Sequence, residues 1–261
     1  MRIATWNINS VRLRIHHVLR FIKEQNIDVM CLQETKTEDK YFPIEKFVDA
    51  GIKHYSFRGE KSYNGVAILS KIPIKSKNFE NWCGLKDTRH ISITLNKNVQ
   101  IHNFYVPAGG DIPDVKKNPK FNHKIKFVRE MDKYFKQKKH VKTILVGDLN
   151  IAPFEHDVWS HKQLLNVVSH TQIETKLLTE LMCNSNWVDV GREFISKDKK
   201  LYSWWSYRNR DWKKSNRGRR LDHIWVSKDL KFNLKSFLCC REIRDWEKPS
   251  DHVPLILELQ I

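Results

Sequence analysis

The sequence TILVGDLN (residues 143–150) is an apolar run, rich in β-branched residues, that passes directly into Gly147, Asp148 and Asn150. Such a run indicates a buried strand, and the polar residues after it then lie at the edge of a sheet. In extended geometry a carboxylate and an amide two residues apart point to the same side, where one handles a proton and the other donates to an oxyanion. An Asx turn that starts the next segment explains the same residues equally well.

Two other segments place polar residues beside apolar runs. Glu34 follows the run 28–32, and Asp251 and His252 precede the last apolar run. A lone glutamate at the end of an apolar strand usually lies in solvent and has no functional role. Three strands that meet at one sheet edge would instead deliver carboxylates, an amide and an imidazole together. That set predicts a site that hydrolyses phosphate esters with a divalent cation, because Mg²⁺ takes oxygen ligands.

Asp222, in the stretch RLDH (220–223), is the candidate partner of His252. An imidazole that bonds to a buried carboxylate is held in one tautomer and favoured as imidazolium, which suits contact with a phosphate. The chain has 12 histidines, and most of them must be ordinary surface or core residues.

The composition is that of an ordinary intracellular protein. The chain has 261 residues, and we find no secretory signal, long apolar span or internal repeat in it, so we expect one domain over residues 1–261. The five cysteines form no CxxC pair, which argues against a zinc site or a disulfide framework. We therefore expect a cytoplasmic protein without membrane attachment.

The formal net charge is +17, and the excess is concentrated in two places. Residues 208–220 hold seven arginines and lysines against the single acid Asp211, and a second basic stretch covers residues 116–142. Phosphate contacts supply sequence-independent affinity by releasing counterions, so polyanion binding is indicated. A solvated surface is the alternative for the second stretch, whereas arginines interleaved with Trp212 favour nucleic acid for the first.

Periodicity predicts a series of strands with helices between them. The predicted strands are residues 2–6, 28–32, 65–70, 91–95, 99–106, 143–146, 221–226, 234–239 and 253–259. The predicted helices are 15–22, 121–135 and 171–182, and the second has an apolar stripe opposite polar faces that hold Lys124 and Lys126. Two mixed sheets packed together, with helices outside, would use this order of elements.

Motifs along the whole chain carry a family resemblance. They are IATWNINSVR (3–12), CLQETK (31–36), NGVAILS (64–70), FYVP (104–107), GDLNIAP (147–153), YSWWSYR (202–208), RLDHIWVS (220–227) and EKPSDHVP (247–254). Together they resemble the exonuclease III family of apurinic/apyrimidinic DNA endonucleases, within the endonuclease/exonuclease/phosphatase superfamily. GDLN or SDH alone would indicate only the superfamily.

The resemblance implies a DNase I-like, four-layered α/β sandwich, in which two packed mixed β-sheets are flanked by helices. It implies Mg²⁺-dependent cleavage, with Mn²⁺ as the alternative metal, 5′ to abasic sites, together with 3′-to-5′ exonuclease and 3′-end-cleaning activity. The partner is then double-stranded DNA with abasic sites or blocked 3′ ends. We expect a bacterial monomer that is associated with the nucleoid through DNA.

The resemblance also assigns roles to individual residues. The implied metal ligands are Asn7, Glu34 and Asp251, with Asp148, Asn150 and His252 as further candidates. The implied catalytic residues are Tyr105 at the scissile phosphate, Asp148 as acid or base, Asn150 as stabiliser of the transition state, and Asp222 orienting His252. The implied DNA contacts are Asn9, Lys36, Lys120, Trp204, Arg208, Asn216, Arg217, Arg219 and Leu221, of which Trp204 and Leu221 wall a pocket for an extruded abasic sugar.

Two positions depart from the family pattern. Ala108 stands where relatives often have Asn or Gln, so one side-chain phosphate contact is either missing or replaced by the backbone amides of Gly109 and Gly110. Arg219 stands where the animal enzymes have a tryptophan in the pocket. We therefore expect a less closed pocket and more exonuclease action on paired 3′ ends.

Two other functions are compatible with part of the pattern. Another branch of the superfamily, such as a phosphoinositide or sphingomyelin phosphodiesterase, would have similar acidic and histidine residues. The stretch 208–220 and the motif RLDHIWVS favour DNA instead. A DNA-binding scaffold without catalysis would lack at least one catalytic residue, and every one is present.

Overall fold

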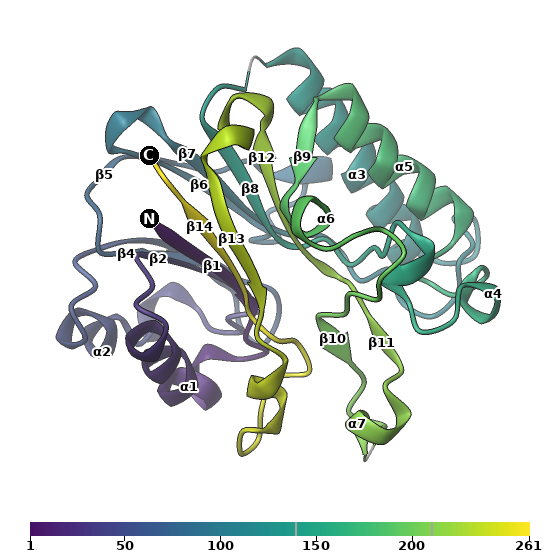
Figure 1. Ribbon diagram of the computed structural model, residues 1–261, viewed down its shortest axis with the longest axis horizontal. Coiled ribbons are helices and arrows are strands. Elements are labelled where there is room, and N and C mark those ends of the chain that lie inside the picture. The colour runs from purple at the N-terminus through teal and green to yellow at the C-terminus, as the bar shows by residue number, and fades with distance from the viewer. Residues whose placement is uncertain (139, 210) are drawn as a thin grey trace.

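The chain folds into two β-sheets that pack face to face, with helices on both outer sides (Figure 1). The computed structural model describes residues 1–138, 140–209 and 211–261. Within these residues each of the two large sheets has six strands. This arrangement confirms the four-layered α/β sandwich that the resemblance implied.

The first sheet has the strand order β13-β14-β1-β2-β4-β3. Its strands are β1 (Arg2–Asn7), β2 (Val29–Gln33), β3 (His54–Arg58), β4 (Val66–Ser70), β13 (Leu234–Cys239) and β14 (Leu255–Leu259). β1 and β2 run parallel and are joined by helix α1 (Val11–Glu24), whereas the other neighbours are antiparallel. The central strands β1, β2 and β4 are almost wholly buried, which is why β2 and β4 each begin with an unbroken apolar run of four residues.

The second sheet has the strand order β5-β6-β7-β8-β12-β9. Its strands are β5 (Ile74–Asn78), β6 (His90–Leu95), β7 (Gln100–Tyr105), β8 (Thr143–Asp148), β9 (Trp187–Asp189) and β12 (Asp222–Ser227). β7 and β8 form its parallel pair, and helix α3 (Pro119–Gln137) lies between them in the chain. Each sheet therefore contains one parallel crossover within an otherwise antiparallel arrangement.

The remaining elements are short, apart from α5. They are α2 (Ile44–Asp49), α4 (His161–Leu164), α5 (Gln172–Asn184), α6 (Val190–Phe194), α7 (Trp212–Ser215), a ribbon of β10 (Trp204–Trp205) and β11 (Gly218–Arg219), and the 3₁₀ turns η1 (Asp39–Tyr41), η2 (Trp82–Gly84), η3 (Asn96–Asn98), η4 (Glu155–Asp157), η5 (Lys228–Asn233) and η6 (Arg241–Asp245). The β10–β11 ribbon and α7 extend below the sandwich in Figure 1.

Three apolar layers hold the sandwich together. Residues such as Ile3, Ile68 and Ile144 fill the space between the sheets. Trp6 and its neighbours pack beneath α1 and α2, and Phe127 and its neighbours pack between the second sheet and helices α3 and α5. Each fully buried large side chain contributes about 1.5–3 kcal/mol to folding, so the layers make a rigid frame for the loops.

All nine strands predicted from the sequence are present, with ends shifted by at most two residues. The prediction missed β3, β5 and β9 and the β10–β11 ribbon. β5 is an edge strand of sequence IKSKN whose last four residues are exposed, so it lacks the apolar alternation that marks a strand. The two strands of the ribbon have two residues each, which is too short for a periodic pattern.

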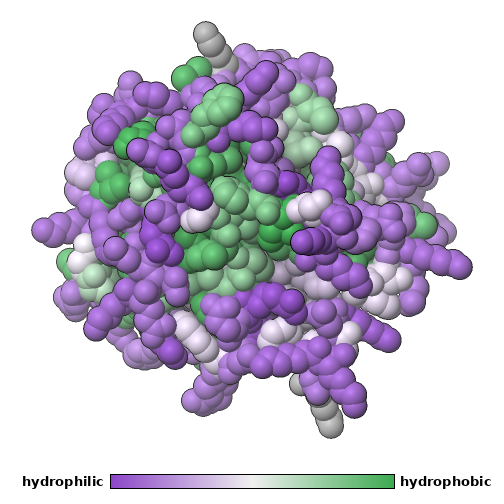
Figure 2. All heavy atoms as spheres, in the orientation of Figure 1, coloured by the Kyte–Doolittle hydropathy of each residue, from purple (hydrophilic) through white to green (hydrophobic). Residues whose placement is uncertain are grey.

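The surface agrees with the highly charged composition. Hydrophilic side chains cover most of the face seen in Figure 2, and apolar side chains gather near its middle. Among the described residues, no helix combines the length and the apolar composition that crossing a membrane requires.

Candidate active site

The central strands of both sheets end at one cleft. At the ends of the parallel pairs, Asn7 lies beside Gln33 and Tyr105 lies beside Asp148. Asp222, the first residue of the antiparallel strand β12, lies opposite Asp148. The carboxyl ends of parallel strands are the usual ligand-binding edge of α/β sheets. The three segments singled out in the sequence therefore meet as predicted.

The cleft has a volume of about 740 Å³. Its lining includes the predicted site residues Glu34, Tyr105, Asp148, Asn150, Trp204, Arg208, Arg217, Arg219, Leu221, Asp251 and His252. Acidic and amide groups form its floor, and arginines with aromatic residues form its rim.

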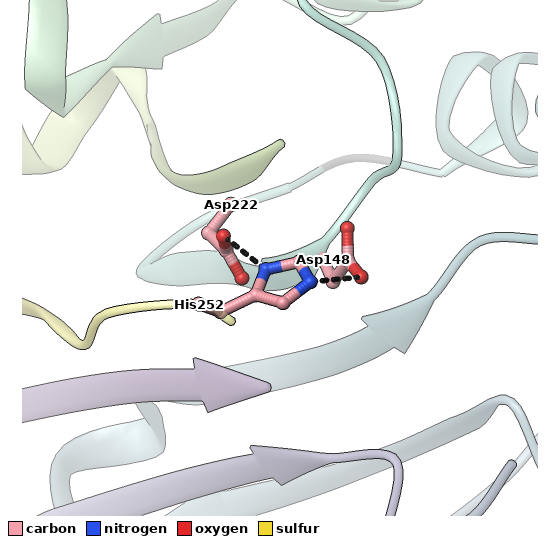
Figure 3. Close-up of side chains that lie close together, drawn as sticks. All are labelled: Asp148, Asp222 and His252. Carbon is pink, nitrogen blue, oxygen red and sulfur yellow. Dashed lines mark hydrogen bonds and ion pairs between the residues drawn. The ribbon is translucent and has the colours of Figure 1, made fainter. Parts of the chain in front are cut away.

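Asp148, His252 and Asp222 lie in a row (Figure 3); the first two line the cleft, and Asp222 is fully buried behind His252. His252 Nδ1 is 2.8 Å from Asp222 Oδ2, and His252 Nε2 is 3.7 Å from Asp148 Oδ2. Ser203 Oγ donates to the same Asp222 oxygen at 2.6 Å and accepts from the backbone N–H of Asp222 at 3.0 Å. These contacts fix the imidazole ring so that Nδ1 faces Asp222 and Nε2 faces the cleft floor.

Opposing effects set the protonation of these groups. Burial lowers the pKa of His252, but Asp222 and Asp148 outweigh burial and raise this pKa to about 10. Burial raises the pKa of Asp148 to about 7, against the charge of His252. The imidazole is therefore cationic at neutral pH, which suits a phosphate better than a metal ion. Asp148 is able to gain and lose a proton near neutrality.

Asn7 bridges two carboxylates of the cleft floor. Its side-chain nitrogen donates to Glu34 Oε1 at 2.9 Å and to Asp148 Oδ2 at 2.8 Å, and its oxygen accepts from the backbone of Asn9 at 3.1 Å. Tyr105 donates its hydroxyl proton to the same Glu34 oxygen at 2.9 Å. The amide oxygen thus faces away from Glu34, so metal ligation by Asn7 needs the opposite amide orientation. That role stays a prediction.

Asn150 enters the cleft through a turn. Its φ is 54°, and its backbone N–H donates to Asp148 Oδ1 at 2.9 Å, which is an Asx turn. Its side-chain nitrogen donates to Val106 O at 2.9 Å and to Asp148 Oδ2 at 3.1 Å. Of the two explanations that the sequence allowed for GDLN, the structure shows the Asx turn and not the extended geometry, and the two side chains still meet.

A chain of polar contacts links Glu34 to Asp251. Lys36 Nζ lies 2.7 Å from Glu34 Oε2 and donates to Asn9 Oδ1 at 2.6 Å, and Asn9 donates to Asp251 Oδ1 at 3.0 Å. Trp204 Nε1 donates to Asp251 Oδ2 at 2.9 Å. Three residues predicted as DNA contacts, Asn9, Lys36 and Trp204, therefore also order the acidic groups.

Glu34 and Asp251 have the donor chemistry that a hard divalent cation requires. Burial raises the pKa of Glu34, but Lys36 and the bond from Asn7 lower it overall. Burial likewise raises the pKa of Asp251, and His252 with the bond from Trp204 lowers it overall. The carboxylates of Glu34 and Asp251 are therefore ionised. The ammonium of Lys36, 2.7 Å from Glu34 Oε2, shows that the oxygens around Glu34 accept a cation. Charged oxygen donors of this kind fit Mg²⁺.

A second group with metal-ligand chemistry lies partly on the cleft floor and partly buried beneath it. Ligand atoms of Asp148, Asp222 and His252 lie within 4.8 Å of one another. The protonated ring of His252 has no free lone pair, so this group fits a metal ion less well than the oxygens around Glu34 do.

Two exposed arginines stand at the rim of the cleft. Arg208 and Arg217 both line it, and Arg217 lies 4.7 Å above the ring centroid of Trp159. Both are free to contact a phosphate backbone. Arg210, which belongs to the same basic stretch, lies outside the described residues.

Arg219 forms part of the pocket wall. Its guanidinium donates to Val168 O at 3.0 Å and to Ser169 Oγ at 2.8 Å, and it lies 5.3 Å from the ring centroid of Trp204. Leu221 is 5% exposed and lines the same cleft. Arg219, Trp204 and Leu221 therefore line the same cleft, and a pocket for an abasic sugar beside them stays a prediction.

Two residues predicted to contact DNA, Lys120 and Asn216, are not among the residues that line the cleft. Lys120 is in the first turn of α3, where its side chain runs near Gly110 at the cleft wall. The side-chain oxygen of Asn216 accepts from Trp205 Nε1 at 3.2 Å and from Arg241 at 3.1 Å, outside the cleft lining. Contacts of Lys120 and Asn216 with DNA stay predictions.

Arg220 was counted in the polyanion-binding stretch, and this assignment is wrong. Its side chain is 1% exposed and forms ion pairs with Asp157 at 3.0 Å and with Asp189 at 2.8 Å. A side chain so enclosed reaches no phosphate, and its charge is already neutralised by two acids.

Lys124 is a residue of the site that sequence analysis missed. We expected it on a polar face of the helix, but it is 0% exposed and donates to the backbone oxygen of Asn150 at 2.8 Å. Its partner Glu174 is equally buried, with 2.5 Å between Lys124 Nζ and Glu174 Oε1. The two lie fifty positions apart, so no local pattern pairs them.

Comparison with known proteins places this geometry among nucleases. The model of the endonuclease/exonuclease/phosphatase family matches residues 4–252. Exodeoxyribonuclease III of Haemophilus influenzae is 29% identical, with 100% of both chains covered. An AP endonuclease from Archaeoglobus fulgidus superposes with a TM-score of 0.93 at 29% identity, over 100% of both chains. The 3′ phosphatase NExo from Neisseria, solved with a product DNA hairpin, gives 0.92 at 28% identity, again over 100% of both chains.

Proposed function

The chain belongs to the endonuclease/exonuclease/phosphatase family, and from this membership and the geometry of the cleft we propose that it is a DNA-repair phosphodiesterase. The row formed by Asp148, His252 and Asp222 carries the proposal. It places an acid–base group with a pKa near neutrality beside a fixed cation. A phosphate held there meets both a proton carrier and a charge that stabilises its transition state.

The residues of the cleft divide the chemistry among themselves. Protonated His252 stabilises the negative charge that builds up on the phosphate. The side-chain amide of Asn150 joins it by exchanging its 3.1 Å bond to Asp148 Oδ2 for a bond to the phosphate, because its other N–H donates to Val106 O. Asp148 either takes a proton from the attacking water or gives one to the leaving 3′ oxygen. A divalent cation at Glu34 and Asp251 supplies, when bound, positive charge that polarises a phosphate oxygen.

The substrate we propose is duplex DNA that carries an abasic site or a blocked 3′ end. An abasic sugar has no base to unstack, so it enters a side pocket at lower cost than an intact nucleotide. The pocket beside Trp204 and Leu221 has the apolar walls for such a sugar, and Arg219 adds a cation to it. Mg²⁺ is the metal we propose, and the cytoplasm is the compartment.

A phosphoinositide or sphingomyelin phosphodiesterase is the rival within the same family. Arg208 and Arg217 stand exposed at the rim, where a duplex backbone passes over a floor-bound phosphate. Arginine beside tryptophan, as at Arg217 and Trp159, is typical of nucleic-acid surfaces. These features favour DNA as the substrate.

One assay tests the proposal. The purified protein is incubated with Mg²⁺ and a duplex that carries a single abasic analogue, a 3′-phosphate end or neither, with and without a chelator. We expect metal-dependent incision at the lesion or removal of the 3′ block. Hydrolysis of phosphoinositide or sphingomyelin vesicles, with intact DNA substrates, would instead place the chain in the rival branch.

Glu34→Gln is expected to weaken metal-dependent activity by at least about 10–100-fold, the cost of losing a residue that only supports a metal ligand, while DNA affinity changes little. The variant keeps an oxygen that accepts from Tyr105 but removes the charge that attracts the cation. Titration of the cleavage rate with Mg²⁺ measures the effect. Glu38→Gln, on a half-buried carboxylate four residues along the chain, is the control. Wild-type Mg²⁺ dependence in Glu34→Gln would remove Glu34 from the metal site.

Arg208→Ala with Arg217→Ala is expected to weaken binding to all duplexes alike. Each lost phosphate contact flattens the slope of log K against log salt by about one unit. Affinity is measured at several salt concentrations. Lys75→Ala with Lys77→Ala removes the same charge from edge strand β5, away from the β10–β11 ribbon in Figure 1, and serves as control. Equal slopes for both variants would assign Arg208 and Arg217 to the solvated surface.

A further inference from the structure

We propose that the buried ion pair of Lys124 and Glu174 is a positioning device that holds the catalytic Asn150 and the pocket wall at Ser169 as one unit. The inference rests on the proposed function for its catalytic consequence. The mechanism of phosphate hydrolysis uses neither charge directly, since no surface of either residue reaches the cleft.

Lys124 holds the two loops that carry the phosphate-facing groups. Its ammonium donates to Asn150 O at 2.8 Å and to Ala108 O at 3.2 Å, and it lies 2.5 Å from Glu174 Oε1. An ammonium has three donors, and these three partners use them all. Gly109, with a φ of 90°, packs so closely that a side chain there would come within 2.9 Å of Lys124 Cδ.

Glu174 holds the opposite wall of the cleft. It lies in the first turn of α5 and forms a capping box with Thr171. Its carboxylate accepts from the backbone N–H of Ser169 at 2.9 Å and from that of Thr171 at 3.1 Å, and from Thr171 Oγ1 at 2.6 Å. Four acceptor sites on one carboxylate are thus divided between Lys124 and the segment 169–171.

Further bonds close the connection between the two loops. The backbone N–H of Ala152 donates to Ser169 O at 2.8 Å, and Arg219 donates to Ser169 Oγ at 2.8 Å. An unbroken path therefore runs from Asn150 through Lys124, Glu174 and Ser169 to Arg219. Asn150, which stabilises the transition state, and Arg219, in the pocket wall, are therefore both held in place by the Lys124–Glu174 pair.

A contribution to the stability of the fold does not by itself explain why the ion pair of Lys124 and Glu174 is buried here. Burying two charges costs desolvation energy, and well-packed apolar residues often replace a buried ion pair with no loss of stability. What apolar residues lack is a donor for the carbonyl of Asn150, which stands in a left-handed backbone conformation with a φ of 54°. The pair supplies that donor, and a misplacement of about 1 Å at a catalytic group lowers the rate up to about 100-fold.

The test is the double variant Lys124→Met with Glu174→Gln, which contains no unpaired buried charge. Gln keeps an oxygen for Ser169 and Thr171, while Asn150 and Ala108 lose their donor. We expect kcat to fall up to about 100-fold with KM for duplex DNA nearly unchanged. In the free protein we expect faster amide hydrogen exchange in peptides covering 149–152 and 167–170. Lys176→Met with Glu180→Gln makes the same changes at an exposed pair of α5 and is expected to behave as wild type.

Two results would overturn the proposal: a wild-type kcat in the double variant, or unchanged exchange in both peptides. Should the double variant not fold, Glu174→Gln alone is measured by the same two readouts, and unchanged exchange in it also contradicts the proposal. A wild-type protein that cleaves no DNA contradicts the proposed function instead, and the exchange measurement then decides the role of the pair by itself.

Discussion

Asp148→Asn is expected to lower kcat by about 10²–10⁴-fold, which is the range that a positioned acid or base contributes. Asp148 has its pKa raised to about 7 by burial, so at neutral pH it can both hold and release a proton. An asparagine of the same shape cannot do so. Removing a negative charge near the bound phosphate leaves DNA affinity equal or higher. Single-turnover cleavage together with equilibrium binding separates the two effects.

Asp111→Asn is the matched control for this experiment. Asp111 is an exposed carboxylate at the rim of the same cleft, so its variant makes the same change of charge away from His252. We expect its cleavage rate to equal that of the wild type. If Asp148→Asn retained a rate within about tenfold of the wild type, the proton would have to be moved by another group, because general acid–base catalysis accounts for more than this.

The strands that carry the site were predictable because burial on both faces of a strand produces a run of apolar residues in the sequence. β1, β2 and β8 are buried over nearly their whole length, with apolar runs that are longest in β2 and β8, and each strand leads into a polar residue of the cleft. The family motifs follow those strand ends. An apolar run and the polar residue that follows it are neighbours in the chain, so both can be read from the sequence directly.

The register between strands was not predictable in the same way. Asp222 faces Asp148 because β12 and β8 pair antiparallel with these two residues as partners. Asn7 reaches both Glu34 and Asp148 because β1 and β8 belong to different sheets that pack against each other. Such pairings depend on how the whole sandwich closes, and no single segment specifies them.

Charged residues gave the largest errors. Arg220 and Lys124 read as members of a basic surface, yet each is buried against acids from distant parts of the chain. Arg219 does line the cleft, as predicted, but its bonds to Val168 and Ser169 were not predictable from its own segment. A count of charges does not distinguish a solvated arginine from one that is paired inside, since the partner is fixed only by the tertiary fold.

His252→Asn is expected to lower kcat by about 10²–10³-fold, and Asp222→Asn by less. His252 presents a cation to the phosphate, whereas Asp222 acts through the ring by holding Nδ1 at 2.8 Å and by keeping the ring protonated. With asparagine at position 222, Asp148 still lies 3.7 Å from Nε2 and preserves part of that effect. Rates of both single variants on a lesion-containing duplex measure the difference, and thermal melting confirms that each variant is folded.

The double variant decides whether His252 and Asp222 work as a pair. A residue that acts only through another has no effect once the other is gone, so Asp222→Asn should cost nothing further in the background of His252→Asn. The same substitution should restore some stability there, because Asp222 is 0% exposed and loses its cationic partner when the ring is removed. Impairment equal to the product of the two single effects would show that Asp222 touches the reaction independently, and the orienting role assigned to it would then be wrong.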